Sequence, residues 1–149
     1  MRAIPDGFST ITPFLALKNA HEAIALYERA FGAKEVHKML CPSGSGKIMH
    51  ACLQIGSSRI FLSEANPEKG CMPTTSSFYV YVDDVDTACR RAKQAGVKET
   101  MPLQDQFWGD RAGSFEDTFG NRWTLASHVR DISDQEIQEA AKKMAAKAA

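Results

Sequence analysis

The sequence predicts an α+β fold made of two βαβββ modules and a C-terminal helix, and an internal repeat is the main reason. The segments FGAKE and AGVKE each close an amphipathic helical pattern, and their glycines, Gly32 and Gly96, lie 96 − 32 = 64 residues apart. The segments IGSSRIFLSE and FGNRWTLASH contain Gly56 and Gly120, again 120 − 56 = 64 residues apart. A recurring separation indicates two similar modules, which we expect at residues 8–65 and 75–130.

The first module begins with a strand and a helix. The segment STITPFLAL, residues 9–17, is a short alternating run rich in β-forming residues. Asn19 followed by Glu22 has the spacing of a capping box, which predicts that a helix starts there. Apolar residues then recur on one helical face as far as Phe31, and Gly32 supplies the left-handed conformation that often ends a helix.

Three strands complete this module, at residues 36–40, 48–55 and 59–63. The segments between them, PSGSG and GSS, are turn signals, because glycine accepts positive φ angles and serine bonds its local backbone. The segment NPEKGCMPTT, residues 66–75, contains proline, glycine and threonine, and we interpret it as the linker between the modules.

The second module repeats the same order of elements. It starts with a strand over SFYVYV, followed by a helix that Asp84 caps and that runs to Ala95. Strands are then expected at residues 97–101, 112–116 and 123–127. After the repeat, Ser133 and Glu136 form a further capping box, which predicts a solvated helix over residues 133–149.

Composition limits the class of protein. A chain of 149 residues is the size of one ordinary domain, and we treat residues 1–149 as one domain. The 18 basic and 18 acidic residues cancel without long runs of one sign, which argues against nucleic-acid binding. No signal peptide and no membrane span are recognisable. The four cysteines form no C-x-x-C pair, so we expect free thiols and a cytoplasmic protein.

Three segments carry a resemblance to a known family: TPFLALKNAHEAIALYERAFGA, MHACLQIGSSRIFLSE and DQFWGDRAGSFEDTFGNRW. Together with the paired modules, they resemble the PhnB-like branch of the glyoxalase/bleomycin-resistance/dioxygenase superfamily, also called vicinal oxygen chelate proteins. The resemblance covers roughly residues 8–130. It implies curved mixed sheets, one per module, that face each other to form a cleft, often completed in a homodimer.

The resemblance also implies where a metal would bind. Enzymes of the superfamily take one ligand from the first strand and one from the last strand of each module, and the matching residues here are Thr12, Ile60, Ser77 and Thr124. Hydroxyl groups are poor ligands for Zn²⁺ or Ni²⁺, and isoleucine is no ligand. We therefore expect a protein that requires no metal cofactor.

An alternative set of metal ligands remains open. His50 begins a strand, and Glu64 and His128 are 128 − 64 = 64 residues apart, at equivalent ends of the two modules. Strand alternation would place Glu64 on one face with Ile60, and His128 on the corresponding face with Thr124. A divalent ion could bind His50, Glu64 and His128 at the mouth of the cleft. His21 and His37 are expected to have no functional role.

The DQFWGDRAG run is the principal candidate for a ligand site. We expect it in a loop before the strand 112–116, where Trp108 could stack on a planar ligand and Arg111 could pair with an acidic one. In the alternative, structural interpretation, Arg111 pairs with Asp105, Asp110 or Asp117. Asp117 and Gly120 of DTFG are expected to form a turn.

Glu116 and Arg111 are the candidate catalytic residues. Glu116 shares a strand face with Ser114 and, through the repeat, with His50, so it could act as an acid or base if that face lines the cleft. The candidate substrate-binding residues come from predicted strands of both modules and from the loop before residues 112–116: Thr12, Phe14, His50, Ser77, Tyr79, Trp108 and Thr124.

Two functions fit these residues. The protein is either a binding protein of the bleomycin-resistance type or an enzyme that transforms a small polar or aromatic molecule without the usual metal ligands. If the alternative ligands His50, Glu64 and His128 hold a metal, the enzyme would be a metal-dependent lyase, isomerase or dioxygenase. The expected partners are a small-molecule ligand and a second copy of the chain, with neither nucleic acid nor membrane.

Overall fold

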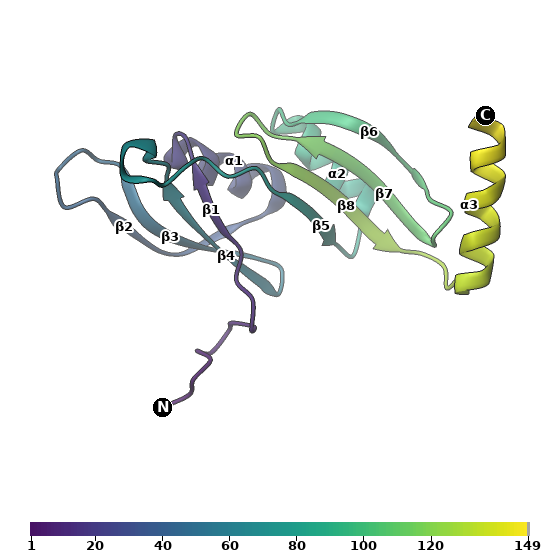
Figure 1. Cartoon of the computed structure of the whole chain (residues 1–149), viewed down its shortest axis with the longest axis horizontal. Coiled ribbons are helices and arrows are strands. Elements are labelled where there is room, and N and C mark those ends of the chain that lie inside the picture. The colour runs from purple at the N-terminus through teal and green to yellow at the C-terminus, as the bar shows by residue number, and fades with distance from the viewer. Residues whose placement is uncertain (149) are drawn as a thin grey trace.

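The chain forms two βαβββ modules, each with one four-stranded mixed sheet, as the sequence predicts (Figure 1). The computed structural model describes residues 1–148. The first sheet has the order β1-β4-β3-β2 and the second the order β5-β8-β7-β6. The elements of the first module are β1 (Phe14–Leu17), α1 (Ala20–Phe31), β2 (Lys34–Leu40), β3 (Ile48–Ile55) and β4 (Ser58–Glu64). Those of the second are β5 (Ser77–Tyr81), α2 (Val85–Gln94), β6 (Lys98–Asp105), β7 (Asp110–Glu116) and β8 (Arg122–His128).

Two further helices lie outside the modules. The linker contains the short 3₁₀ helix η1 (Pro67–Lys69), and the chain continues after β8 into α3 (Asp134–Ala148). The expected cap of α3 is present, since the Ser133 hydroxyl accepts the Glu136 N–H at 3.2 Å. α3 contains no buried residue and lies apart from the sheets (Figure 1). Within residues 1–148, no helix is long and apolar enough to cross a membrane.

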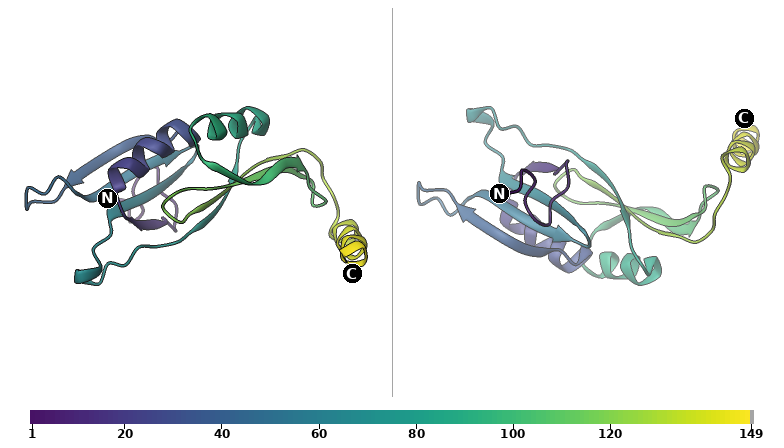
Figure 2. Two further views of the ribbon diagram at one scale, coloured as in Figure 1. Left: turned by 90° about the horizontal axis from the view of Figure 1, so that it is seen from above. Right: turned by 90° about the horizontal axis from the view of Figure 1, so that it is seen from below.

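The two sheets follow one another along the long axis of the molecule, and α1 and α2 pack against each other on one side of them (Figure 2). Arg91 of α2 fixes this contact, because its Nε donates to the carbonyl of Arg29 at 2.8 Å and its Nη2 to that of Glu28 at 3.1 Å. These carbonyls lie in the last turn of α1, where the helix itself leaves them without a partner.

A buried polar cluster joins the modules more deeply. Asp117, in the turn between β7 and β8, accepts hydrogen bonds from the Tyr27 hydroxyl at 2.6 Å and the Trp123 indole at 3.0 Å. Its other oxygen accepts the main-chain N–H groups of Phe119 and Asn121, both at 2.9 Å. The DTFG segment is therefore a structural turn, as expected, and it also holds α1 against the second module.

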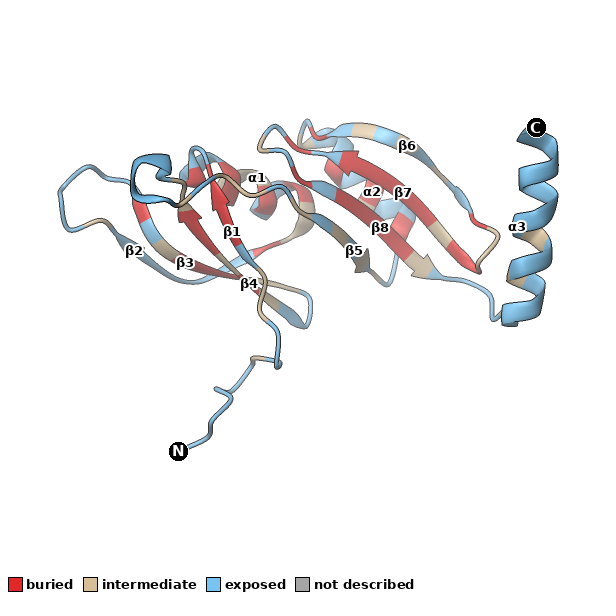
Figure 3. Ribbon diagram, viewed as in Figure 1, coloured by how far each residue is buried: buried red, intermediate tan, exposed pale blue. Residues whose placement is uncertain are grey.

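Two clusters of buried hydrophobic residues pack between the sheets and the two helices, and Figure 3 shows the buried positions along these elements. The aromatic rings at the centre come from both modules, and Phe31 stacks on Trp123 with ring centroids 4.3 Å apart. On β7 and β8, Phe115 and Leu125 pack with the buried residues of α2. Since side chains alternate along a strand, Ser114 and Thr124 lie on the other side, which we call the open face of the sheet.

The sequence separation between equivalent residues of the two modules is not the same in every element. Leu62 pairs with Leu15, and Leu125 pairs with Val80, with both pairs on the helix-facing side. The offset between β4 and β8 is thus 125 − 62 = 63, one less than between the helices. Ile60 faces the helices with 5% exposure, so its expected equivalence with Thr124 is wrong, and Phe61 is the equivalent residue (124 − 61 = 63).

Two local expectations from the sequence also require correction. Asn19 adopts φ 62° without a side-chain capping bond, and Glu64 instead accepts the N–H groups of Asn19 at 2.9 Å and Ala20 at 2.8 Å. A carboxylate at a helix N-terminus is electrostatically favourable, so Glu64 caps α1. Strands β6 and β7 extend further than expected, which leaves only residues 106–109 as the turn and places Arg111 in a strand.

Candidate functional site

The principal candidate site is a cavity of about 960 Å³ between the two modules. Its apolar wall includes Phe31, Ile60, Phe78, Val80 and Trp123, and Thr12 lines its rim. The volume lies in the range of pockets that hold small organic molecules, and the lining combines this apolar wall with polar and charged side chains.

Strand β5 supplies a polar side of this cavity. Because β5 is an edge strand, one row of its main-chain N–H and C=O groups has no partner in the sheet. Residues 78–83 all line the cavity, including Tyr79 and Tyr81. This strand can therefore offer both main-chain hydrogen bonds and aromatic surface to a ligand.

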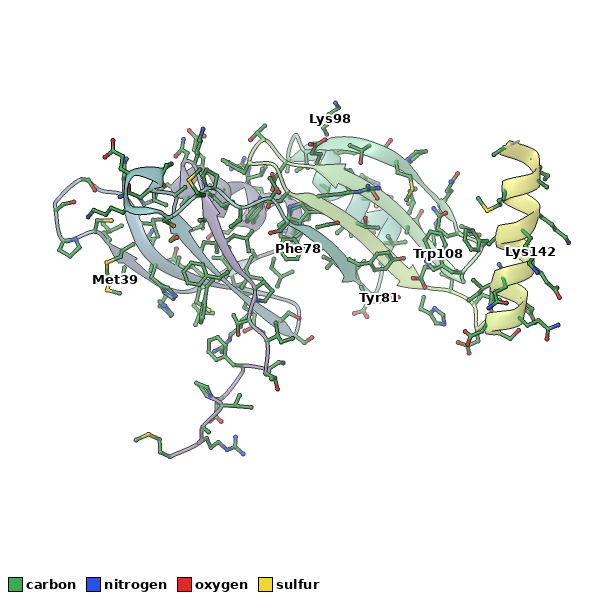
Figure 4. The ribbon with its side chains drawn as sticks, viewed as in Figure 1. Met39, Phe78, Tyr81, Lys98, Trp108 and Lys142 are labelled. Carbon is green, nitrogen blue, oxygen red and sulfur yellow. The ribbon has the colours of Figure 1, made fainter. Side chains whose placement is uncertain are left out.

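The two tyrosines connect the cavity to a polar network on the open face of the second sheet. Asp110 is 2% exposed, and its Oδ2 accepts the hydroxyls of Tyr79 at 2.7 Å and Tyr81 at 2.9 Å and the Trp108 indole N–H at 3.2 Å. Figure 4 shows Tyr81 on β5 and Trp108 near the start of β7. One buried oxygen thus orients three aromatic side chains.

His128 completes this network. It lies opposite Asp110 in the register of β7 and β8, with Nδ1 2.8 Å from Asp110 Oδ1 and Nε2 2.7 Å from Asp131 Oδ1. Hydrogen bonds to Asp110 and then Asp131 raise the pKa of His128, because both carboxylates favour the charged imidazolium.

The same network shifts the pKa values of Asp110 and Tyr79. Burial opposes charge on Asp110, but hydrogen bonds from His128, Tyr79, Tyr81 and Trp108 outweigh it and lower the Asp110 pKa. Burial, with the hydrogen bond to Asp110, raises the pKa of Tyr79 to about 12. Tyr79 therefore remains a neutral hydrogen-bond donor near neutral pH, beside a charged carboxylate.

Gly109 is required for the turn that presents Trp108 and Asp110. It has φ +100°, and a Cβ atom at this position would collide with the carbonyl oxygen of Arg130. Its own carbonyl accepts the N–H groups of Val129 at 3.0 Å and Arg130 at 3.1 Å. The WGD segment is thus held against the chain that leaves β8.

The structure assigns Arg111 a structural contact. Its guanidinium binds both carboxylate oxygens of Asp86 in α2, with Nε–Oδ2 3.1 Å and Nη2–Oδ1 3.0 Å, and Nη1 lies 3.2 Å from Asp105. These ion pairs raise the pKa of Arg111. Arg111 lies on the helix-facing side of β7, opposite the open face, and it does not line the cavity.

The other predicted residues divide between three places. Ser77 and Thr124 share the open face of the second sheet with Tyr79, and the Thr124 hydroxyl lies 2.8 Å from that of Ser114. Glu116 is exposed at the far end of this sheet, where it pairs in register with Arg122. It does not line the large cavity.

Phe14 and His50 belong to the open face of the first sheet. Their rings are 5.7 Å apart, and His50 also contacts Phe61 at 4.7 Å between ring centroids. The His37 ring stacks on His50 at 5.0 Å, with Nε2 of His37 2.9 Å from Nδ1 of His50. Sequence reasoning gave His37 no role, and the structure makes it the partner of His50.

The structure does not assemble the alternative metal ligands. Glu64 caps α1, His50 pairs with His37, and His128 binds two carboxylates, so the three residues have separate surroundings. Among residues 1–148, no group of three or more His, Cys, Asp or Glu side chains is arranged to hold a metal ion. The four cysteines are free, as expected.

Sequence reasoning missed the role of Asp110 and of Tyr81. Asp110 was considered only as a partner for Arg111, although it falls in the DQFWGD run. The available signal was the alternation of Tyr79 and Tyr81 on one strand, which predicts two hydroxyls on one face. Nothing local to Asp110 indicates that both hydroxyls converge on it.

Comparisons with known proteins agree with this architecture. The model of the Glyoxalase/Bleomycin resistance protein/Dioxygenase superfamily matches residues 9–125. An uncharacterised protein of Mycobacterium bovis is 35% identical in an alignment of length 139, and the match covers 87% of this chain and 90% of that protein.

Solved structures show the same fold. TioX from Micromonospora sp. ML1 superposes with a TM-score of 0.69 at 28% identity, over 81% of this chain and 99% of TioX. A PhnB protein of Bacillus cereus, described as a putative 3-demethylubiquinone-9 3-methyltransferase, superposes with a TM-score of 0.63 at 22% identity. This match covers 80% of this chain and 99% of the PhnB protein.

Proposed function

Because the chain belongs to the glyoxalase/bleomycin resistance protein/dioxygenase superfamily, we propose that it binds a small polar or aromatic molecule in the cavity between its modules. The observation that carries this proposal is the cavity itself, with an apolar wall built from both modules and polar groups along β5. Size, aromatic lining and a few oriented polar groups together favour an organic ligand.

We further propose that binding requires no divalent metal. The donor set supports this, because the positions that match the superfamily's metal ligands carry Thr12, Ser77, Thr124 and an apolar residue. This holds whether the fourth position is Ile60 or its structural replacement, Phe61. Neutral hydroxyls and hydrocarbon side chains do not replace the water shell of Zn²⁺ or Ni²⁺.

A homodimer is also part of the proposal. Aromatic residues on the open faces of the sheets remain accessible in one chain, with Phe14 51%, Tyr79 45% and Tyr81 64% exposed. Large exposed apolar groups of this kind are typical of interaction surfaces. A second copy covering these faces would extend the ligand site beyond the cavity of one chain.

Catalysis is the second candidate function, and the Asp110–His128 pair favours it. A buried carboxylate bonded to one ring nitrogen fixes the tautomer and orientation of a histidine, an arrangement that enzymes use for general acid–base chemistry. Here the other nitrogen binds Asp131, whose side chain is fully exposed. His128 would act as a base only after Asp131 moves away. Glu116 as a catalytic residue stays a prediction.

Native mass spectrometry of protein purified from its own cells tests the binding proposal. We expect a retained organic molecule in the wild type and its loss in Ser58→Trp, because Ser58 is an exposed residue at the start of β4 and lines the cavity. Ser45→Trp is the matched control, in an exposed turn away from the cavity. Retention of the same molecule by both variants would contradict binding in the cavity, and elemental analysis of the same sample tests the proposed absence of metal.

A further inference from the structure

The charged residues that line the cavity are two arginines and one aspartate: Arg59, Arg91 and Asp83. The salt bridges of residues 1–148 include neither arginine, although each lies beside main-chain carbonyl groups. The cavity wall therefore carries a net positive charge, two arginines against one aspartate, and neither arginine is in an ion pair within residues 1–148.

Arg59 is the more enclosed of the two cations. It is half-buried, its Nε donates to Gln54 Oε1 at 2.9 Å, and its Nη1 donates to the Asp6 carbonyl at 3.2 Å. Phe8 lies against the guanidinium, 4.6 Å from its central carbon to the ring centroid. Only neutral acceptors orient this group, and they engage two of its five N–H donors.

Arg91 is exposed and also oriented by neutral acceptors. Its two bonds to carbonyls of α1 hold the guanidinium at the α1 end of the cavity, beside Gly32. Three of its N–H donors likewise have no protein partner in these bonds. A second fixed positive charge thus borders the same apolar space as Arg59.

We propose that the ligand of this cavity is a small organic anion with a flat apolar body, an inference that rests on the function proposed above. The acid group binds Arg59, where partial burial makes the charge less screened, and Arg91 adds attraction. The flat body lies against Phe78, a half-buried ring that lines the cavity. The buried Trp123 supports this ring from behind, with ring centroids 4.7 Å apart. Asp83 is exposed, so solvent weakens its opposing charge.

The charges on the cavity wall disfavour a cationic ligand and give no advantage to a neutral one. A cation would meet two guanidinium groups and only one carboxylate, the exposed Asp83, so like-charge repulsion costs binding free energy. A neutral aromatic molecule would gain the same apolar contact but leave both guanidinium groups without a charged partner. Charge, and not shape, therefore separates these classes, and a pair of probes of the same shape can distinguish them.

The experiment titrates the full-length protein with 2-naphthoate and with 2-naphthamide at low salt, by calorimetry and by NMR of backbone amides. We expect 2-naphthoate to bind at least tenfold more tightly, since a charge-assisted pair contributes more than a neutral contact. Arg59→Met should remove this preference, and Arg59→Lys should keep part of it. Arg90→Met is the matched control, because Arg90 is the exposed neighbour of Arg91 and does not line the cavity.

The outcomes separate the two proposals. Equal affinity for both probes, with shifts at cavity residues that Ser58→Trp abolishes, would overturn the anion inference and leave cavity binding intact. An unchanged preference in both Arg59 variants would also overturn it. If neither probe shifts the cavity residues, both the anion inference and the binding proposal fail. If Arg59→Met does not fold, Arg59→Lys and Arg91→Met decide, with a smaller preference expected in each.

Discussion

Removing one hydroxyl group from Tyr27 should destabilise the protein strongly, because this hydroxyl joins the two modules. It donates to Asp117 at 2.6 Å and accepts the Asn121 amide at 3.1 Å, all three side chains being buried. Burial, together with the hydrogen bond to Asp117, raises the pKa of Tyr27, so the hydroxyl stays protonated and donating. Tyr27→Phe keeps the ring and deletes both bonds.

The size of the destabilisation follows from Asp117 and Asn121, which each lose a hydrogen-bond partner when the Tyr27 hydroxyl is removed. A hydrogen bond to a charged group contributes about 1.5–3 kcal/mol, and a buried donor left without a partner costs about 1–3 kcal/mol. Allowing for relaxation, Tyr27→Phe should lower the free energy of unfolding by about 2–4 kcal/mol. In a chain of this length, that corresponds to a decrease in Tm of about 5–12 °C.

Urea denaturation and calorimetry measure this loss directly. Tyr81→Phe is the matched control, since it deletes a hydroxyl that also donates to an aspartate, but from an exposed side chain. Asp110 keeps three other donors in that variant, so we expect a loss below about 1 kcal/mol. A loss below about 0.5 kcal/mol for Tyr27→Phe would refute the reasoning that this cluster holds the modules together.

Three further predictions address the turn, the histidine and the oligomer. Gly109→Ala should destabilise the fold by more than about 3 kcal/mol, because the new Cβ would collide with the Arg130 carbonyl. Gly44→Ala is the control, also at positive φ but in open space, and should cost about 1 kcal/mol. Equal urea midpoints for the two variants would contradict the predicted collision. His128→Gln should lose stability mainly between the lowered pKa of Asp110 and the ordinary histidine pKa of about 6.5, and the difference should shrink as pH rises through the raised pKa of His128. Urea midpoints measured across this pH range check it, and a pH-independent difference would count against the ion pair. Sedimentation equilibrium should give twice the chain mass of 16.4 kDa at micromolar concentration, and a monomer alone would refute the proposed dimer.

Local sequence patterns predicted most of the fold, because the signals that define its elements are local. Gly32 ends α1 at φ 69°, and Asp84 caps α2 through the Thr87 N–H at 3.1 Å, as their residue types indicate. Where a distant residue supplies the cap, the local pattern misleads. Glu64 replaces the expected capping box of α1 from 45 residues along the chain.

The site was harder to predict, because a shift of one residue in the assumed alignment changes the face of the sheet on which a side chain is expected. Side chains alternate with a period of two, so a one-residue difference in turn length moves a residue to the opposite side of the sheet. The pairs Leu53–Ile60 and Phe115–Trp123 enclose six and seven residues, and this difference explains the error at Ile60. The Asp110 network required tertiary structure, since its members come from β5, β7, β8 and a turn.

The two contacts between modules, through Arg91 and through Asp117, have a consequence for how a ligand would bind. They fix α1 to α2 at one point and to the β7–β8 turn at another, so the modules resist rotation about a single hinge. The cavity walls are then in place before any ligand arrives, and little conformational entropy is lost on binding. Association would be governed by diffusion to an open entrance and would not wait for domain closure. A ligand of modest size could thus reach useful affinity with few contacts.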